Sequence, residues 1–544
     1  MFNNRLDLRR EPLRRARAGV PPLSGASTVL QRVSRGRAGG EHHGVIFPLR
    51  TVTPVLAALT IALTAAPAAT AAPGAAPGCS DPTAPLTVEE QRLTAVLDPD
   101  APPVGPELAR LGGFDDEVAR FASALCGVGK RDAAGLAQRT GEGLWRAAVE
   151  RAQAPQSWDA HDDRPLYWAR LGMTKALRQW KPRWTLPAAE RSALVDRLDR
   201  ASRGLSDVRF RADAAPTAVP RAAGDDNGGG RGSADGPHAA GSPAAGVTSL
   251  DQLGSTIGAD PLALLGARAE AAPAPAPAPA PEERTAPEDR AAVRRIALTG
   301  FDPFFLDGSG ITRSNPSGAA ALQLDGRVFD TPQGRVLVEV AVLPVTWGEF
   351  DKGIVERFYG STVTGGQRPH AFVTVSQGRP GQFDVERWAA RWRGWSPDNN
   401  NASSPGVVPD AAGWPQPSTE FIETTLPHER MTTTPTGDYP VLFNRGFCEF
   451  PAGATPAPGA QRCGTGEPTP GATAASGGGG DYLSNESMYR ANRVRTGLGA
   501  TDVRGGHLHT PVLSQPEGDA LTDGFFEAER RAIADQVVAL VALV

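Results

Sequence analysis

Apolar residues recur at helical spacing through the first part of the chain that reads as folded. The run from Phe114 to Cys126 places them three or four positions apart, which is the spacing of one helix face. Thr87 and Glu90 form a capping-box pattern ahead of the first apolar run. Similar helical patterns cover three further stretches: 134–152, 166–180 and 187–205. These patterns predict a small all-α domain over residues 80–213, with its tryptophans packed in the core.

Strand patterns alternate with helix patterns from residue 293 to residue 544. The expected strands are Arg294–Thr299, Val336–Leu343, His370–Val375 and Gly506–Pro511. The expected helices are Pro316–Leu324, Phe350–Tyr359, Tyr489–Val494 and Thr522–Val544. This alternation predicts a three-layer α/β/α domain over 291–544, with a mostly parallel twisted sheet. Ligands of such domains bind at the carboxyl ends of the strands.

A stretch rich in Gly, Ala and Pro separates these two regions. Residues 214–290 include the alternating Ala-Pro tract from Ala272 to Pro281 and bury too little apolar surface to fold alone. We therefore expect a disordered linker there. The whole chain has 62 Gly and 50 Pro among 544 residues, which favours two or three domains with linkers over one compact domain.

The segment from Pro54 to Ala66 is apolar and short, and Ala69 to Ala71 supplies a small-residue cleavage site. This is typical of a secretory signal peptide. We expect residues 1–71 to comprise an N-terminal extension plus this signal, with a misassigned start and translation from near Val45 or Val52. The chain is then exported, secreted or held in the cell envelope, with no membrane span after cleavage. The alternative of a buried apolar helix lacks a preceding folded sequence to pack against.

Four cysteines are consistent with export. An even count in an oxidising compartment favours two disulfides, for which three pairings are possible. We expect the pairing that is local in sequence, Cys79 with Cys126 and Cys448 with Cys463. The alternative is four buried thiols. A formal net charge of −4 gives no reason to expect nucleic-acid binding.

Seven short segments of the C-terminal domain stand in a specific order. They are Thr299–Phe304 with Asn315-Pro316-Ser317, Leu343-Pro344-Val345, Gly378-Arg379 with Glu386-Arg387, Pro397-Asp398-Asn399, Thr425-Leu426-Pro427, Gly479–Tyr489, and His507–Pro511. Together they resemble pyroglutamyl-peptidase I (pyrrolidone-carboxylate peptidase), a family of cysteine peptidases that remove an N-terminal pyroglutamyl residue. The resemblance covers the C-terminal domain alone.

The resemblance implies a catalytic triad with one changed member. Glu386 and His509 stand at the positions of the family's carboxylate and imidazole, while Ser484 stands where the family has cysteine. A hydroxyl needs a general base, and the base needs an orienting group. Ser484 also lies where a Gly-rich loop runs into a helix, whose amino terminus can stabilise an oxyanion. The alternative is a silent site, in which Ser484 is a loop or cap residue.

The resemblance also implies a substrate pocket. Phe301 and Phe304 would sandwich the flat pyroglutamyl ring, with Asn315 beside them, although core packing is the alternative for both rings. Tyr482 and Leu483, directly before Ser484, complete the expected substrate-binding set. Two departures from the family bear on this pocket: Phe305-Leu306 replaces Gly-Gly, and Trp395-Ser396 replaces Arg-Ile. The loop from Arg445 to Gly480 is an insertion before Ser484.

His507 and His509 are two residues apart on an expected strand, so both face one side of it. A catalytic zinc needs a third ligand. The other histidines of the domain, His370 and His428, stand in no recognisable ligand motif. We expect no metal and no cofactor.

Two classes of function follow. One is an exported omega-peptidase that removes pyroglutamyl residues through Ser484. The other is a catalytically inactive homologue that binds peptide termini or serves as a scaffold. The expected partner is a peptide with an N-terminal pyroglutamate, and association of the chain with itself stays open. The chemistry of Ser484 separates the two classes.

Overall fold

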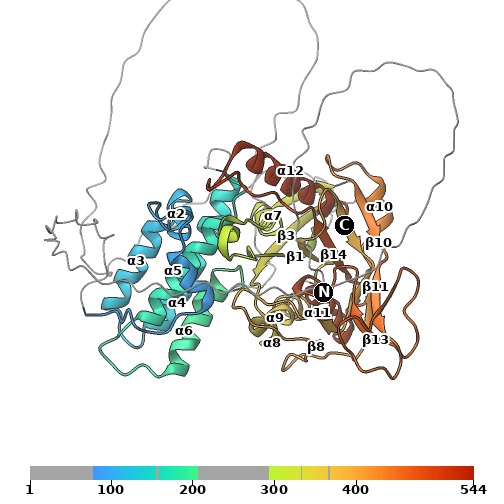
Figure 1. Cartoon of the computed structure of the whole chain (residues 1–544), viewed down its shortest axis with the longest axis horizontal. Coiled ribbons are helices and arrows are strands. Elements are labelled where there is room, and N and C mark those ends of the chain that lie inside the picture. Colours follow the sequence, from blue (N-terminus) through green and yellow to red (C-terminus); the bar gives the residue numbers. More distant parts are fainter. Residues whose placement is uncertain (1–77, 155–158, 206–292, 332–333, 366–367) are drawn as a thin grey trace, which may run out of the picture. The chain divides into compact units, whose positions relative to one another are not determined.

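The computed structural model describes residues 78–154, 159–205, 293–331, 334–365 and 368–544 (Figure 1). All of them except 457–459 belong to one compact unit. The expected signal peptide and almost all of the expected linker lie outside the described residues. Within them, a helical region of residues 78–205 is followed by an α/β region that begins at residue 293.

The helical region follows the predicted pattern with one addition. Its elements are α1 (Val88–Gln91), a 3-10 turn (Arg92–Thr94), α2 (Val104–Leu111), α3 (Asp115–Gly127), α4 (Ala133–Gln153), α5 (Arg164–Gln179) and α6 (Ala188–Ala201). The capping box is confirmed, because the Thr87 hydroxyl accepts from the Glu90 amide and the Glu90 carboxylate accepts from the Thr87 amide. Helix α2 escaped prediction because it is short and carries Gly105 and Pro106.

Tryptophans fill the core of the helical region, as predicted for Trp145, Trp168 and Trp180, which are all buried. The same hydrophobic cluster continues into the α/β region, where it includes Ile296 and Val338. The two regions therefore share one core rather than meeting across a solvated boundary.

The central sheet has seven strands in the order β10-β5-β14-β4-β1-β3-β2. They are β1 (Arg294–Phe301), β2 (Val328–Thr331), β3 (Gly334–Leu343), β4 (Ala371–Gln377), β5 (Phe383–Glu386), β10 (Val441–Asn444) and β14 (Arg504–Thr510). Strand β1 lies parallel to β3 and β4, β4 to β14, and β5 to β10, whereas β14–β5 and β2–β3 are antiparallel. The predicted α/β fold with a mostly parallel sheet is confirmed.

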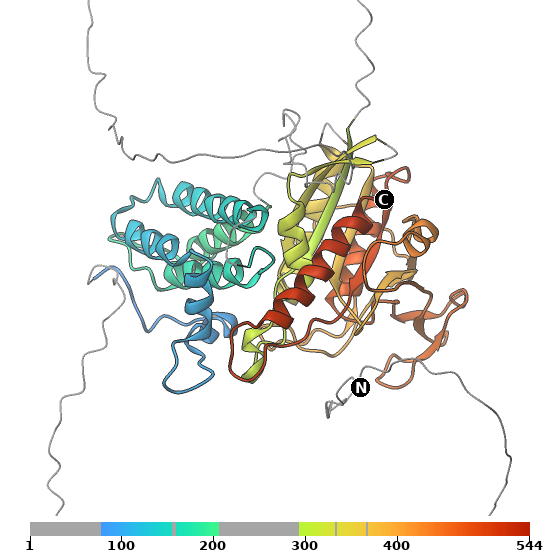
Figure 2. The ribbon, with the colours of Figure 1, turned by 90° about the horizontal axis from the view of Figure 1, so that it is seen from above.

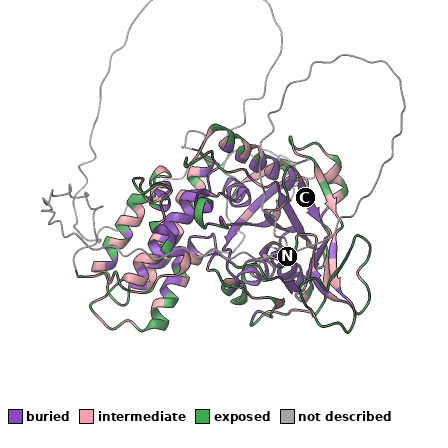
Figure 3. Ribbon diagram, viewed as in Figure 1, coloured by how far each residue is buried: buried purple, intermediate pink, exposed green. Residues whose placement is uncertain are grey.

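Helices cover both faces of this sheet. One face carries α7 (Pro316–Leu324) and α12 (Gly524–Val541); the other carries α8 (Trp347–Asp351), α9 (Ile354–Thr364) and α11 (Leu483–Gly497) (Figures 1 and 2). Strand β1 shows the alternation that this requires, since Ile296 packs towards α7 and α12 while Ala297 packs towards α9 and α11. The inner strands of the sheet are accordingly buried, the edge strands β2 and β10 are partly exposed, and the helices expose their outer sides (Figure 3).

One predicted helix is wrong in extent. Residues 350–359 do not form a single helix but belong to α8 and α9, which are separated at Gly353. Gly353 has a φ of 76°, a left-handed conformation that ends α8 and that glycine adopts without a steric penalty.

Three smaller sheets are formed by residues that follow β5 in the sequence. They contain β6 (Trp388–Ala390), β7 (Trp392–Arg393), β8 (Gly406–Val407), β9 (Phe421–Glu423), β11 (Phe447–Phe450), β12 (Arg462–Gly464) and β13 (Thr473–Ser476), with α10 (His428–Thr433) nearby in sequence. Cys448 and Cys463 face each other across β11 and β12 and are bonded. The bond Cys79–Cys126 completes the predicted local pairing, which is confirmed.

Two disulfides indicate an oxidising compartment. Across the described ranges, the structure contains no helix that is both long enough and apolar enough to cross a membrane.

Candidate active site

A carboxylate and an imidazole meet where strands β5 and β14 run side by side. Glu386 is the last residue of β5, and His509 lies near the end of β14. His509 Nδ1 is 2.7 Å from Glu386 Oε1, and both side chains are buried. An Nδ1–H that donates to the carboxylate leaves Nε2 as the free basic nitrogen, the arrangement that a general base needs.

Asn444 is a third member of this group, and no sequence pattern pointed to it. It ends β10 and stands opposite Glu386 in the parallel pairing of β10 with β5. Its amide nitrogen donates to Glu386 Oε2 at 2.7 Å and to the Gly478 carbonyl at 2.9 Å. Asn444 therefore fixes the carboxylate oxygen that His509 does not use. Strand β10 has only four residues, too few for a clear period-two pattern.

The glycine run before Ser484 lies directly against the Glu386–His509 pair. A Cβ on Gly478 would overlap Glu386 Oε2, and a Cβ on Gly479 would lie 2.8 Å from His509 Cε1. Side chains are excluded at both positions, so only glycine lets the chain approach this closely. The Gly478 amide also donates to the Trp388 carbonyl, which ties the run to β6.

Helix α11 begins beside the imidazole. The Cβ position of Gly479 is 3.6 Å from His509 Nε2 and 3.7 Å from the Asn485 backbone nitrogen, so the imidazole and the first turn of the helix both lie against Gly479. Ser484 is the second residue of α11 and is half-buried. Within the described part of the chain, its hydroxyl makes no hydrogen bond, and no acceptor takes the backbone N–H of Ser484 or Asn485. The positive end of the helix is thus open next to the base.

The side chain of Asn485 holds the start of α11 in place. Its Oδ1 accepts from the Ala390 amide at 2.8 Å, and its Nδ2 donates to the Ala390 carbonyl at 2.9 Å. The next residue, Glu486, is fully buried and accepts from Arg393 and Arg490. These contacts tie the helix to the strands that follow Glu386, so the first turn has a fixed position relative to the Glu386–His509 pair.

The predicted pocket residues lie in the adjacent hydrophobic cluster. Phe301 and Leu483 are both buried within it, and Phe304 and Tyr482 pack against it while staying half-buried. The Phe301 ring stacks on Phe350 with centroids 6.1 Å apart. Phe301 is therefore mainly a core residue, and Phe304 and Tyr482 are the members that still reach a surface.

Asn315 is buried and caps helix α7. Its Oδ1 accepts from the Ser317 amide and hydroxyl, and its Nδ2 donates to the Asp302 carbonyl. The structure thus gives Asn315 a local role, which is to fix the chain just before Pro303 and Phe304.

Phe305 stands at a position where the resemblance to pyroglutamyl-peptidase I implies glycine. Its backbone is left-handed, with a φ of 56°. Such a conformation is uncommon for a bulky residue. The ring is 52% exposed and stacks on Tyr482 with centroids 6.4 Å apart. Trp395, the other departure, is also exposed. Both substitutions put large rings near the segment that precedes Ser484.

His507 differs from His509 although both lie on β14. Its Nδ1 is 2.7 Å from the Thr374 hydroxyl and its Nε2 is 2.9 Å from the Ser376 hydroxyl, so both ring nitrogens have partners. Burial, with a smaller effect of neighbouring His509, lowers the pKa of His507 well below its ordinary value. Among the described residues no three His, Cys, Asp or Glu side chains gather as metal ligands do.

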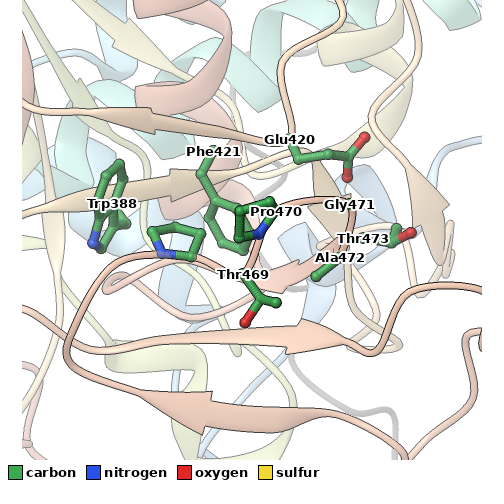
Figure 4. A pocket seen from close by; sticks show the side chains of 9 residues that line it. Trp388, Glu420, Phe421, Thr469, Pro470, Gly471, Ala472 and Thr473 are labelled. Carbon is green, nitrogen blue, oxygen red and sulfur yellow. The ribbon is translucent and has the colours of Figure 1, made fainter.

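A cavity of about 470 Å³ lies apart from these residues (Figure 4). It is lined by Trp388, Glu420, Phe421 and residues 468–473. None of the predicted site residues lines it.

Comparison with known proteins finds similar domains in both regions of the chain. Residues 68–199 match the model of the PA0049 N-terminal domain, and residues 295–438 and 447–514 match that of the PA0049 C-terminal domain. The chain is 28% identical to the uncharacterized protein PA0049 of Pseudomonas aeruginosa over 568 aligned positions, which cover 84% of this chain and 88% of that protein.

Among solved structures, pyroglutamyl peptidase I of Bacillus amyloliquefaciens aligns with 46% of this chain and 97% of its own length. That alignment has 18% identity and a TM-score of 0.29. The two matching models describe successive domains of one family, in the order found here. The chain is therefore similar, in the same order, to the N-terminal and the C-terminal domain of PA0049.

Proposed function

We propose that the chain is an exported peptidase that removes N-terminal pyroglutamyl residues, with Ser484 in place of the nucleophilic cysteine. The observation that carries the proposal is the buried Glu386–His509 pair, whose imidazole lies against the same glycine, Gly479, as the first turn of the helix that bears Ser484. The ordered segments that resemble pyroglutamyl-peptidase I support the choice of substrate. The two disulfides support export.

The reaction would proceed by acyl transfer. Ser484 Oγ attacks the carbonyl carbon of the peptide bond that joins the pyroglutamyl residue to the next residue. His509 Nε2 takes the hydroxyl proton, and Glu386 stabilises the resulting imidazolium. The oxyanion lies at the open N–H groups of Ser484 and Asn485. The C–N bond then breaks, and His509 returns the proton to the leaving amine. Water, deprotonated by His509, hydrolyses the ester and regenerates Ser484.

Serine needs more activation than cysteine in this position, because a hydroxyl ionises far less readily than a thiol and depends on the general base. The Ser484 hydroxyl makes no hydrogen bond to His509. Catalytic hydrogen bonds are often loose before substrate binds. This is also the observation that favours the second candidate, a domain that binds pyroglutamyl termini without cleaving them.

The test is release of a fluorophore from a pyroglutamyl substrate by the mature chain. We expect turnover by the natural protein and none by Ser484→Ala, whose binding of a pyroglutamyl peptide should be largely retained. Ser484→Cys is the matched comparison, because it restores the thiol in the same position. Turnover that appears only in Ser484→Cys, together with peptide binding by the natural chain, would establish the binding function instead.

A further inference from the structure

Polar side chains of the helical region reach two loops beside the candidate site. One loop follows β1 and contains Asp302, Pro303 and Phe304; the other is the turn at Asp398 and Asn399. These loops belong to the segments that carry the resemblance. The residues that contact them come from a region that the resemblance does not cover.

Glu89 makes the first of these contacts. It lies on α1, is 9% exposed, and its Oε1 accepts from the Tyr167 hydroxyl at 3.0 Å and from Asn399 Nδ2 at 3.1 Å. Asn399 Nδ2 also donates to the Pro303 carbonyl at 2.9 Å. The Glu89 carboxylate thus stands behind Asn399, and Asn399 holds the peptide directly before Phe304.

Asp302 makes the second contact, with two arginines. Arg170 Nη1 donates to both carboxylate oxygens of Asp302 at 2.9 Å, and Arg203 Nη1 donates to Oδ2 at 2.5 Å. All three residues are buried. A buried carboxylate that loses such partners is strongly destabilised, so the two arginines fix the position of Asp302.

We propose that the helical region supplies positioning residues to the substrate pocket: Glu89 acts through Asn399, and Arg170 with Arg203 acts through Asp302, to hold the Pro303–Phe304 wall. The inference rests on the proposed function for the identity of the ligand. It assigns the helical region a role in binding the pyroglutamyl ring, while the chemistry stays with Glu386, His509 and Ser484.

The neighbouring residue Glu90 provides a matched control. It lies on the same short helix and is also buried, but its carboxylate accepts from the Thr87 amide and from Arg178, both within the helical region. Glu89 and Glu90 therefore differ mainly in which region they contact. Substituting each by glutamine keeps the size of the side chain and its capacity to accept hydrogen bonds.

The experiment measures kcat and KM of the full mature chain with a pyroglutamyl fluorogenic substrate. Glu89→Ala should raise KM about tenfold with a much smaller change in kcat, because it removes a hydrogen bond that shapes the binding wall. Glu89→Gln should restore most of the affinity, since its Oε1 can still accept from Asn399. Glu90→Gln should leave KM unchanged.

Hydrogen exchange supplies a readout that needs no substrate. Glu89→Ala should speed exchange of the backbone amides of residues 302–306 and 398–401, relative to Glu90→Gln, and leave residues 483–497 unaffected. Unchanged exchange in both loops would overturn the inference. So would faster exchange with an unchanged KM.

A failure of the proposed function is distinguishable from a failure of this inference. If the natural chain binds a pyroglutamyl peptide without cleaving it, dissociation constants replace KM, and weaker binding by Glu89→Ala supports the inference although hydrolysis is wrong. Equal binding by Glu89→Ala and the natural chain overturns the inference alone. Absence of both binding and turnover overturns the two together.

Discussion

The two sides of the candidate site are built in different ways. The side that carries the chemistry consists of Glu386, His509, Asn444 and the first turn of α11, all within the α/β region. The proposed binding side, at Pro303 and Phe304, is held by side chains of the helical region. The chemistry is thus supported from within one sheet and its helices, whereas the pocket wall depends on a separate region. Rate and affinity should therefore respond to different substitutions.

The largest expected effect comes from removing the base. His509→Ala should lower kcat by roughly a thousandfold or more, because members of a catalytic triad act as a unit. For the same reason, His509→Ala combined with Ser484→Ala should be little worse than either alone. Steady-state kinetics on purified variants measures this. Additive losses would show that the two residues do not work in one step.

The second effect concerns Glu89, in the helical region, and is a change in the free energy of unfolding. Burial, followed by the charge of Asp302, raises the pKa of Glu89 from 4.5 to about 7. The neutral carboxyl of Glu89 is therefore favoured in the folded protein. Its contribution to the free energy of unfolding is complete below pH 4.5 and is lost as the pH rises through about 7. Glu89→Gln, which cannot ionise, should gain stability relative to the natural chain over this interval, by up to about 3 kcal/mol at alkaline pH.

Denaturant unfolding at a series of pH values checks this prediction. Smaller effects oppose this rise in the pKa of Glu89: the charge of Arg203 and the hydrogen bonds from Asn399 and Tyr167 lower it. These groups therefore also face the Glu89 carboxyl. A stability difference that does not grow between acid and alkaline pH would mean that folding does not raise the pKa of Glu89.

The third effect returns to the chemistry. Asn444→Ala removes the donor to Glu386 Oε2 and frees the Gly478 carbonyl. We expect kcat to fall about tenfold, the consequence of losing one hydrogen bond to a charged group, with little change in KM. This is the converse of Glu89→Ala. A change in KM alone would contradict the division of the site into two sides.

The smallest effect is expected at Phe305. Phe305→Gly relieves a left-handed backbone at the cost of the ring contacts with Phe304 and Tyr482. The opposing terms should leave the free energy of unfolding within about 1 kcal/mol of the natural value. Removing this exposed ring should lower KM if the ring narrows the access of substrate to the proposed pocket. Steady-state kinetics of Phe305→Gly measures this. An unchanged KM would place the ring away from the substrate path.

Local patterns predicted the longer helices and four strands of the central sheet, but neither the short strands nor the contacts between distant segments. Helices α3 to α7 and strands β1, β3, β4 and β14 follow from periodicity, since each holds a sustained apolar face. The resemblance, not spacing, selected Glu386 and His509 among the titratable residues. Asn444 and Glu89 carry no local signal, because their importance arises from residues far away in sequence; Glu89 and Asn399 are 310 positions apart.

The pair of histidines on β14 shows the same limit at close range. His507 and His509 look equivalent in sequence, yet the neighbouring strand β4 supplies two hydroxyls to His507 while β5 supplies a carboxylate near His509. Which histidine can act as a base is decided by the order of strands in the sheet.

The salt bridges from Arg170 and Arg203 to Asp302 have a consequence for folding cooperativity. They join residues before and after the long stretch 206–292, and the hydrophobic cluster is continuous across the same boundary. Neither region can separate without exposing apolar surface and leaving an acidic group without its counterions. Despite their separation along the chain, the two regions should therefore melt together on heating, as a single calorimetric transition.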